Sequence, residues 1–575
     1  VLAHPLAQIE KGTGIAMICT FGDLTDVIWW RELNLPTRAI IGRDGRIITT
    51  PPNGLDSASG VTAYEQIAGL FINQAQTKVV EMLRECGAML GEPRAIMHPV
   101  KFFEKGDRPL EIVTSRQWYI RNGGRDTDLR GALLNRGENL VWHPDHMRHR
   151  YSNWVEGLNG DWLISRQRYF GVPVPVWYPV DADGETVHDS PIVPTEDMLP
   201  IDPSTDVPVG YTADQRNQPN GFIGDPDVMD TWATSSLSPQ IAGKWEDDAD
   251  LFGRIFPMDL RPQAHDIIRT WLFSTVVRSN FEHDSLPWKN AALSGWILDP
   301  DRKKMSKSKG NVVTPVDLFE KFGSDAVRYW AASARPGIDT AFSEDQMKVG
   351  KKLATKLLNA TKFVLTFPQP NVDAKPTHPV DLAMLARVAE TVREATVAFD
   401  QYDYARALER TEAMFWWFCD DYVELVKGRV YNSQGPDASG SAISALRLAL
   451  SALQRLLAPF MPFTTETVWR WWQNGSVHTA TWPTTAELGP IGDSAILDPI
   501  GEILSQVRRA KTDAKTSQKT AVTEATVSAT EAVLTAFELG RGDLSDAGSV
   551  RSWVTVASTN ETTVSAVLAP PEPAS

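Results

Sequence analysis

KMSKSKGN, residues 304–311, is the stretch of this sequence that says most about the fold. It follows an apolar run, residues 291–298, that predicts a β-strand. Lysine ammonium groups supply positive charge, serine hydroxyls and backbone N–H groups donate hydrogen bonds, and glycine lets the backbone approach a ligand closely. Such donors stabilise the charge that develops on a departing pyrophosphate. We therefore expect a polyphosphate-binding loop near the end of a strand, and we prefer this interpretation to a solvated basic turn.

The pentapeptide KMSKS resembles the signature loop of the class I aminoacyl-tRNA synthetases, and the sequence as a whole resembles the valyl-tRNA synthetase family. Four other segments carry the resemblance. In chain order they are Gly12-Thr13-Gly14 with Asp23 and Asp26, Asp161–Gly171, Asp230-Thr231-Trp232, and His265–Trp271. Several matches in the family's order are far more specific than any one of them. The resemblance implies ATP with Mg²⁺, valine and tRNA(Val) as ligands.

The resemblance also assigns roles within the lysine loop. Activation joins a carboxylate to the α-phosphate of ATP, so the protein mainly positions groups and neutralises charge. Lys304 and Lys307 would face the pyrophosphate, and Ser306 and Ser308 would donate hydrogen bonds to it. Asp266 would accept a hydrogen bond from the ribose or from the amino group of the substrate. The implied ATP-binding residues are Lys304, Met305, Ser306, Lys307, Ser308 and Asp266.

An apolar amino acid requires a closely fitting dry pocket, for which the resemblance selects Trp232, Ile267 and Trp271. Indole rings are large and rigid, so they fix the volume of a pocket. Ordinary core packing is the alternative for the same side chains. An isoleucine enzyme of the same class is an alternative for the whole chain, and the context of these three residues favours valine.

A second, hydrolytic site is expected because an apolar pocket discriminates poorly against isosteric threonine, a problem for which the valine enzyme is the standard example. The resemblance implies that Gly12-Thr13-Gly14 brings the backbone close to the tRNA 3′ end. Asp26 would hold the amino group of mischarged threonyl-tRNA, with Asp23 beside it. Met17 and Cys19 replace residues that are Lys and Thr in many family members, so the detailed contacts stay open.

Composition narrows the remaining classes of function. The net charge of −15 would repel nucleic acid, so tRNA binding requires locally basic surface. The three cysteines are far apart and form no CxxC pair, which predicts neither a disulfide framework nor a structural zinc site. We interpret His143, His146 and His149 as a polar surface segment, because the third would point away from the face that the first two share on a helix. No apolar run is long enough to span a membrane, and we predict a cytoplasmic monomer.

The length of 575 residues predicts three or four domains. Residues 1–125 resemble part of an editing insertion. Residues 126–345 alternate strand-like and helical runs, which predicts an α/β domain with a parallel sheet. The resemblance implies that this domain is the second half of a Rossmann-like catalytic domain. Residues 346–490 repeat apolar positions at helical spacing, as at Leu353 and Leu357, and the resemblance makes this helical bundle the anticodon-binding domain.

Residues 491–575 predict a small α/β appendage that ends in a disordered tail. Its basic amphipathic helix is expected to bury Ile503 and Val507 and to carry Arg508 and Lys511 mostly off that apolar face. Contact with tRNA is one reading of this helix and a solvated surface is the other.

No His-x-Gly-His sequence occurs in the chain, although class I synthetases pair their KMSKS loop with such a motif. We interpret the chain as the C-terminal part of a longer enzyme. The alternative is a truncated paralogue that binds tRNA without making an aminoacyl-adenylate.

Overall fold

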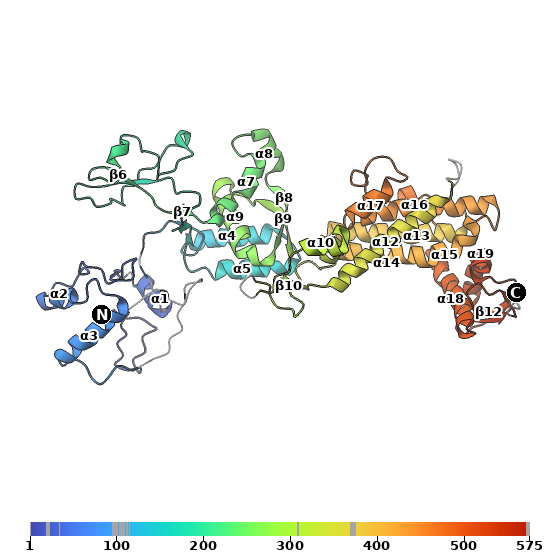
Figure 1. Cartoon of the computed structure of the whole chain (residues 1–575), viewed down its shortest axis with the longest axis horizontal. Coiled ribbons are helices and arrows are strands. Elements are labelled where there is room, and N and C mark those ends of the chain that lie inside the picture. The colour runs from blue at the N-terminus through green and yellow to red at the C-terminus, as the bar shows by residue number, and fades with distance from the viewer. Residues whose placement is uncertain are drawn as a thin grey trace. The chain divides into compact units, whose positions relative to one another are not determined.

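A computed structural model describes residues 2–18, 24–33, 35–94, 102, 110, 113, 115–306, 310–368 and 375–570. The chain forms two compact units (Figure 1), residues 1–119 with 163–165, and residues 120–162 with 166–575. Four residues named above, Cys19, Asp23, Lys307 and Ser308, lie outside the described residues.

The described residues of the first unit form the helices α1 (Leu24–Glu32), α2 (Ala58–Glu65) and α3 (Ile72–Glu85), with a small core of Ile47, Tyr64 and Ala75. The sequence suggests one helix near residues 61–86, and this is wrong. Gly69 takes a left-handed φ of 76° between α2 and α3, so the chain turns there. A turn at residues 42–45 lies between Ile41 and Ile47, which form an antiparallel bridge.

A parallel sheet of order β2-β9-β8 forms the centre of the α/β part of the second unit. Its strands are β2 (Val141–His143), β9 (Trp288–Ser294) and β8 (Met258–Ala264). The helices α4 (Thr127–Asn139), α5 (Arg148–Glu156) and α9 (Phe273–His283) share a core with it, to which Leu133, Trp142, Tyr151, Leu272 and Ala291 contribute. The register pairs Ala264 with Ser294, so the carboxyl ends of β8 and β9 lie side by side.

Further short elements occur in this part of the chain. They are β1 (Tyr119–Ile120), β3 (Trp162–Leu163), β4 (Ser165–Arg166), β5 (Trp177–Pro179), β6 (Phe222–Gly224), β7 (Val228–Met229), α6 (Thr231–Ser235), α7 (Ser238–Gly243) and α8 (Ala249–Ile255). After β9 the chain forms β10 (Ile297–Leu298), which pairs in parallel with β11 (Thr340–Ala341). Between them lie the lysine loop and two helices, α10 (Val316–Phe322) and α11 (Ser324–Ala332).

Long helices follow. They are α12 (Glu344–Thr366), α13 (Pro379–Asp400), α14 (Tyr404–Trp417), α15 (Val423–Val430), α16 (Pro436–Leu457) and α17 (Pro462–Trp469). The prediction of an apolar face in α12 is confirmed at Leu353 and Leu357, which are fully buried. The aromatic segment after Met414 is mainly core: Phe415 and Phe418 are buried, whereas Trp416 and Trp417 are partly exposed.

The C-terminal appendage consists of α18 (Leu497–Asp513), β12 (Val522–Ala529), α19 (Glu531–Gly548), β13 (Trp553–Ala557) and β14 (Thr563–Leu568). The strands form one sheet of order β13-β12-β14. Ile503 and Val507 are buried as expected, but the expectation for Lys511 is wrong. Its side chain is buried and its ammonium donates to the carbonyls of Gln518 and Gly548. Among the described residues, no helix is both long and apolar enough to cross a membrane.

Candidate active site

The lysine loop begins at the strand end where the sequence predicts it. Lys304 forms an antiparallel bridge with Leu298 of β10. Asn311 closes the loop from the other side, since its side chain accepts from the Ser306 N–H at 2.9 Å and donates to Asp299 at 2.8 Å. That donation from the Asn311 amide lowers the pKa of the Asp299 carboxyl. Lys304 is therefore bound to the last residue of β10, and Asn311 to the residue that follows it.

His265 and Asp339 connect the ends of the parallel strands. His265 follows β8 directly, is buried, and lies 3.1 Å through Nε2 from Oδ1 of Asp339. The same carboxylate oxygen accepts from the Trp296 N–H, which follows β9, at 2.8 Å. This backbone hydrogen bond is the main reason why the pKa of Asp339 is lowered. Ligand sites in parallel α/β sheets lie at such carboxyl ends.

Trp296 brings the loop to the turn after β8. Its ring centroid lies 3.9 Å from the Lys304 ammonium and 4.8 Å from the centroid of the His265 ring. Asp266 and Ile267 follow His265 and are half-buried. Lys304 therefore contacts the Trp296 ring directly. The Asp266–Ile267 turn directly follows His265, which contacts the same ring.

The two predicted pocket segments also meet. Trp271 donates from its indole nitrogen to the Ser235 carbonyl at 2.9 Å, which ties the segment after His265 to α6. Trp232 lies in the first turn of α6, where its N–H donates to the Asp230 side chain. Arg166 in turn donates to Asp230 at 2.9 Å. Trp232 and Trp271 are both half-buried, as walls of a pocket would be.

Arg261 is a residue that the sequence reasoning missed. Its guanidinium carbon lies 2.8 Å from the Trp271 ring centroid and 5.0 Å from that of Trp288, and its side chain is buried. Burial lowers the pKa of Arg261 to about 9. A lone arginine in a strand of mixed polarity carries no spacing signal, so only the fold reveals that it supports the face of Trp271.

The predicted editing residues lie in the first unit. Gly12 and Gly14 both adopt left-handed φ, and Thr13 accepts from the Ile15 N–H. Gly14 lines a cavity of about 270 Å³ together with His4, Ile15 and Trp29. Asp26 lies in the first turn of α1, three residues before Trp29, and is half-buried. About one helical turn therefore separates Asp26 from Trp29, one of the residues that line the cavity.

In the described part of the chain, no group of three or more His, Cys, Asp or Glu side chains is placed to hold a metal ion. His143 instead lies 3.0 Å from the Asn290 side chain and stacks on Tyr402 with ring centroids 4.1 Å apart.

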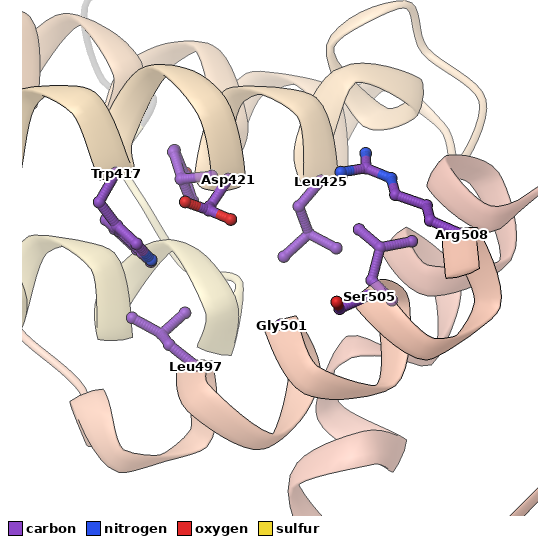
Figure 2. Close-up of a pocket in the computed structure, with 9 residues that line it drawn as sticks. Trp417, Asp421, Leu425, Leu497, Gly501, Ser505 and Arg508 are labelled. Atoms are coloured by element: carbon purple, nitrogen blue, oxygen red, sulfur yellow. The ribbon is translucent and has the colours of Figure 1, made fainter. Parts of the chain in front are cut away.

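A second hollow, of about 150 Å³, lies between the bundle and α18. Figure 2 shows Trp417, Asp421 and Leu425 facing α18, from which Ser505 and Arg508 border the hollow. Burial raises the pKa of Asp421, and the neighbouring Asp420 adds to the shift. This hollow combines an indole, a carboxyl group and an arginine.

Comparison with known proteins agrees with this arrangement. The family model described as tRNA synthetases class I (I, L, M and V) matches residues 55–343, just over half of the chain. The model described as the anticodon-binding domain of tRNA ligase matches residues 381–527. The parallel sheet, the lysine loop at its carboxyl edge and these matches define a class I tRNA synthetase, and they confirm the predicted fold class.

Individual relatives narrow the class. A valine–tRNA ligase from Thermobifida fusca is 63% identical over 96% of this chain and 63% of its own length. One from Salinispora arenicola is 58% identical over 96% of this chain and 67% of its own length. The chain belongs to the valine–tRNA ligase family, as the motifs predict, and spans about two thirds of the length of these curated relatives.

A solved structure, the ternary complex of Agrobacterium radiobacter K84 agnB2 LeuRS with tRNA and LeuAMS, is more distant. It aligns at 21% identity with a TM-score of 0.46, over 57% of this chain and 42% of that one. This likeness is too weak to add to the family assignment.

Proposed function

We propose that this chain is part of an enzyme that ligates valine to tRNA(Val) through a valyl-adenylate made from ATP. The observation that supports the proposal most is the meeting of the lysine loop and the turn after β8 around Trp296, in a chain 58–63% identical to valine–tRNA ligases. Residues 126–345 would supply the second half of the catalytic domain, 346–490 the anticodon-binding bundle and 491–575 the appendage. Mg²⁺ would enter bound to the nucleotide.

In this proposal the loop stabilises the pyrophosphate as it leaves. Lys304 and Lys307 neutralise its charge, and Ser306 and Ser308 donate hydrogen bonds, each such group contributing a few kcal/mol when it is preorganised. Met305 lies within the same loop. Asp266 accepts from the ribose or from the amino group of valine. Trp232, Ile267 and Trp271 enclose the isopropyl side chain, with Arg261 behind Trp271.

We expect Lys307→Ala to lower the rate of adenylate formation about a hundredfold or more, because one preorganised donor to the developing charge is lost. The assay is valine-dependent ATP–pyrophosphate exchange by a version extended with the N-terminal part of the Thermobifida fusca relative. Lys303→Ala is the matched control, since Lys303 lies before the loop and pairs with Asp301. Equal rates for the two variants would remove the assignment of Lys307.

The same assay separates the alternatives. Exchange with valine by the extended version supports the proposal. Exchange with isoleucine at least as fast as with valine supports an isoleucine enzyme. Absence of exchange with either amino acid, with tRNA binding retained, supports a tRNA-binding paralogue without adenylation activity.

We further propose that the first unit takes part in hydrolysis of threonyl-tRNA(Val). The cavity beside Gly14 and Trp29, one helical turn from Asp26, supports this role, in which Asp23 and Gly12-Thr13-Gly14 also take part. In the extended version, Asp26→Ala should let threonyl-tRNA(Val) accumulate, whereas Asp56→Ala, at an exposed position of the same unit, should not. Unchanged deacylation in Asp26→Ala would contradict the proposal.

The bundle and α18 are the proposed contact with tRNA. Aromatic faces and arginine side chains suit nucleobases and phosphates, and the hollow that Trp417 and Arg508 border offers both. A monomer in the cytoplasm stays our prediction for the assembly and location of the enzyme.

A further inference from the structure

The first lysine of the loop rests on an aromatic ring that its proposed role does not by itself require. The Lys304 side chain is exposed, yet its ammonium lies 3.9 Å from the centroid of Trp296. A cation at this distance from the face of an indole is attracted by the ring quadrupole. A long, exposed lysine is thereby held in one direction.

Contacts that do not involve the loop hold the backbone of Trp296, and one more lies against its ring. The Trp296 N–H donates to Asp339 at 2.8 Å, and its carbonyl accepts from the Thr340 N–H at 2.9 Å. His265, bound to the same Asp339, lies against the ring. Trp296 is therefore a rigid surface at the carboxyl ends of β8 and β9.

The choice of tryptophan at this position is not explained by filling space. Its indole N–H is buried and finds no hydrogen-bond partner within the described part of the chain. Burying an unpaired donor is unfavourable, whereas an aliphatic side chain would fill the same space without it. Unlike an aliphatic side chain, the indole provides an aromatic face, and Lys304 lies over this face.

We propose that Trp296 is a positioning residue for Lys304. It holds the ammonium group beside the turn after β8 before a polyphosphate binds, so that less side-chain freedom is lost on binding. The inference deepens the proposed function of the loop and rests on it. Lys304 is the group that contacts the phosphate, and Trp296 acts only through it.

The contact can be observed in the chain by itself. Reductive ¹³C-methylation of lysines gives one NMR signal per side chain, and Lys304→Arg identifies that of Lys304. We expect this signal to be shifted upfield by the Trp296 ring current, to keep only part of that shift in Trp296→Phe, and to return to the position of an exposed lysine in Trp296→Leu. A Lys304 signal already at the exposed-lysine position in the wild-type chain would overturn the proposal.

Trp296→Phe carries this test if Trp296→Leu fails to fold. The phenylalanine ring has a weaker ring current, so the Lys304 signal must move part of the way toward the exposed position. A signal that does not move at all would contradict the contact.

The consequence for binding is measured with inorganic pyrophosphate by calorimetry at low ionic strength. Trp296→Leu should raise the dissociation constant about two- to fivefold, the range expected for one exposed cation–π contact. In a Lys304→Gln background the same change should have no effect, whereas in a Lys303→Gln background its effect should persist. Equal weakening by Trp296→Leu with and without Lys304 would show a general structural role and overturn the proposal.

Different results would contradict the proposed function of the loop and the positioning role of Trp296. A wild-type chain that binds no pyrophosphate contradicts the proposed function of the loop, and with it the purpose of the contact. A wild-type chain that binds pyrophosphate with no dependence on Trp296 contradicts the positioning role alone.

Discussion

At the scale of single residues, Gly295 sets the geometry at the carboxyl end of β9, beside the lysine loop. A Cβ atom added there would lie 2.2 Å from the carbonyl carbon and oxygen of Ile338. Only glycine therefore allows the backbone after β9 to approach the backbone before β11. That approach brings the Trp296 N–H to Asp339 and fixes the ring that Lys304 contacts.

We expect Gly295→Ala to lower the free energy of unfolding by about 1–3 kcal/mol, because backbone atoms must move apart to admit the methyl group. The Lys304 NMR signal should shift toward that of an exposed lysine in the same variant. Gly253→Ala is the control, since no atom lies within 4 Å of the added methyl in α8 and alanine favours a helix. Equal stability of the two variants would contradict the close approach at Gly295.

At the scale of elements, a buried ionic cluster joins the appendage to the bundle. Arg429 of α15 donates to both carboxylate oxygens of Asp381 in α13, at 2.8 and 2.7 Å, and to Asp543 of α19 at 2.6 Å. Tyr422 and Ser441 also donate to Asp381. All three charged side chains are buried. One guanidinium thus neutralises two carboxylates. Asp543 receives one hydrogen bond from Arg429 and Asp381 receives two, so the burial of the Asp543 charge is compensated less well.

Arg429→Met should lower the free energy of unfolding by about 3–5 kcal/mol, because two carboxylates stay buried without their cation. Chemical denaturation measures the change. The control Arg541→Met removes an exposed pair with Glu538 on α19 and should cost less than about 1 kcal/mol. A loss of stability in Arg429→Met no larger than in the control would show that the cluster is not buried in solution.

The cluster also predicts a dependence on pH. Burial raises the pKa of Asp543 to about 6, although Arg429 acts in the opposite direction. A raised pKa means that the native state holds its proton up to a higher pH than the unfolded state, whose aspartate titrates near pH 4. Stability from this group is therefore fully present below about pH 4 and is lost as the pH rises through about 6.

Asp543→Asn removes the titration and serves as the reference. The stability of the wild-type chain relative to this variant should fall by up to about 3 kcal/mol between pH 4 and pH 7, from about 1.4 kcal/mol for each pKa unit. Melting temperatures across that range measure it. A constant difference between the two proteins would contradict a raised pKa.

The sequence predicts features that depend on residues close together in the chain, and it does not predict contacts between residues far apart in the chain. The lysine loop after a strand and the buried face of α12 are local patterns, and both predictions are confirmed. The Arg429 cluster joins residues 48 and 114 positions apart, so no local pattern reveals it. The prediction that Lys511 lies off the apolar face is wrong for a related reason. Its ammonium donates to two carbonyls, one of them 37 residues away at Gly548, and only the folded appendage brings these groups together.

The same distinction holds for the residues of the candidate site. Lys304, Trp232 and Trp271 are predicted from the sequence because they lie in recognisable motifs. Trp296 and Arg261 carry no motif, and their roles depend on which rings and cations the sheet brings together. The roles of all these residues in catalysis stay predictions.

At the scale of the whole molecule, the second unit links the catalytic part to the bundle through α11. Asp325 accepts from the N–H groups of Phe463 and Thr464 at the start of α17, and Tyr329 donates to Glu412 of α14 at 2.7 Å. Such part-buried, directional contacts favour one arrangement of α11 on the bundle.

The central claim is that the lysine loop and the tryptophan-lined pocket form one site for making valyl-adenylate. Valine-dependent ATP–pyrophosphate exchange by the extended enzyme, compared between wild type, Lys304→Ala and Trp271→Ala, tests it most directly. We expect a loss of about a hundredfold in Lys304→Ala and, in Trp271→Ala, a raised KM for valine with improved use of isoleucine. Exchange that is indifferent to Lys304, or an unchanged preference for valine over isoleucine in Trp271→Ala, would contradict it.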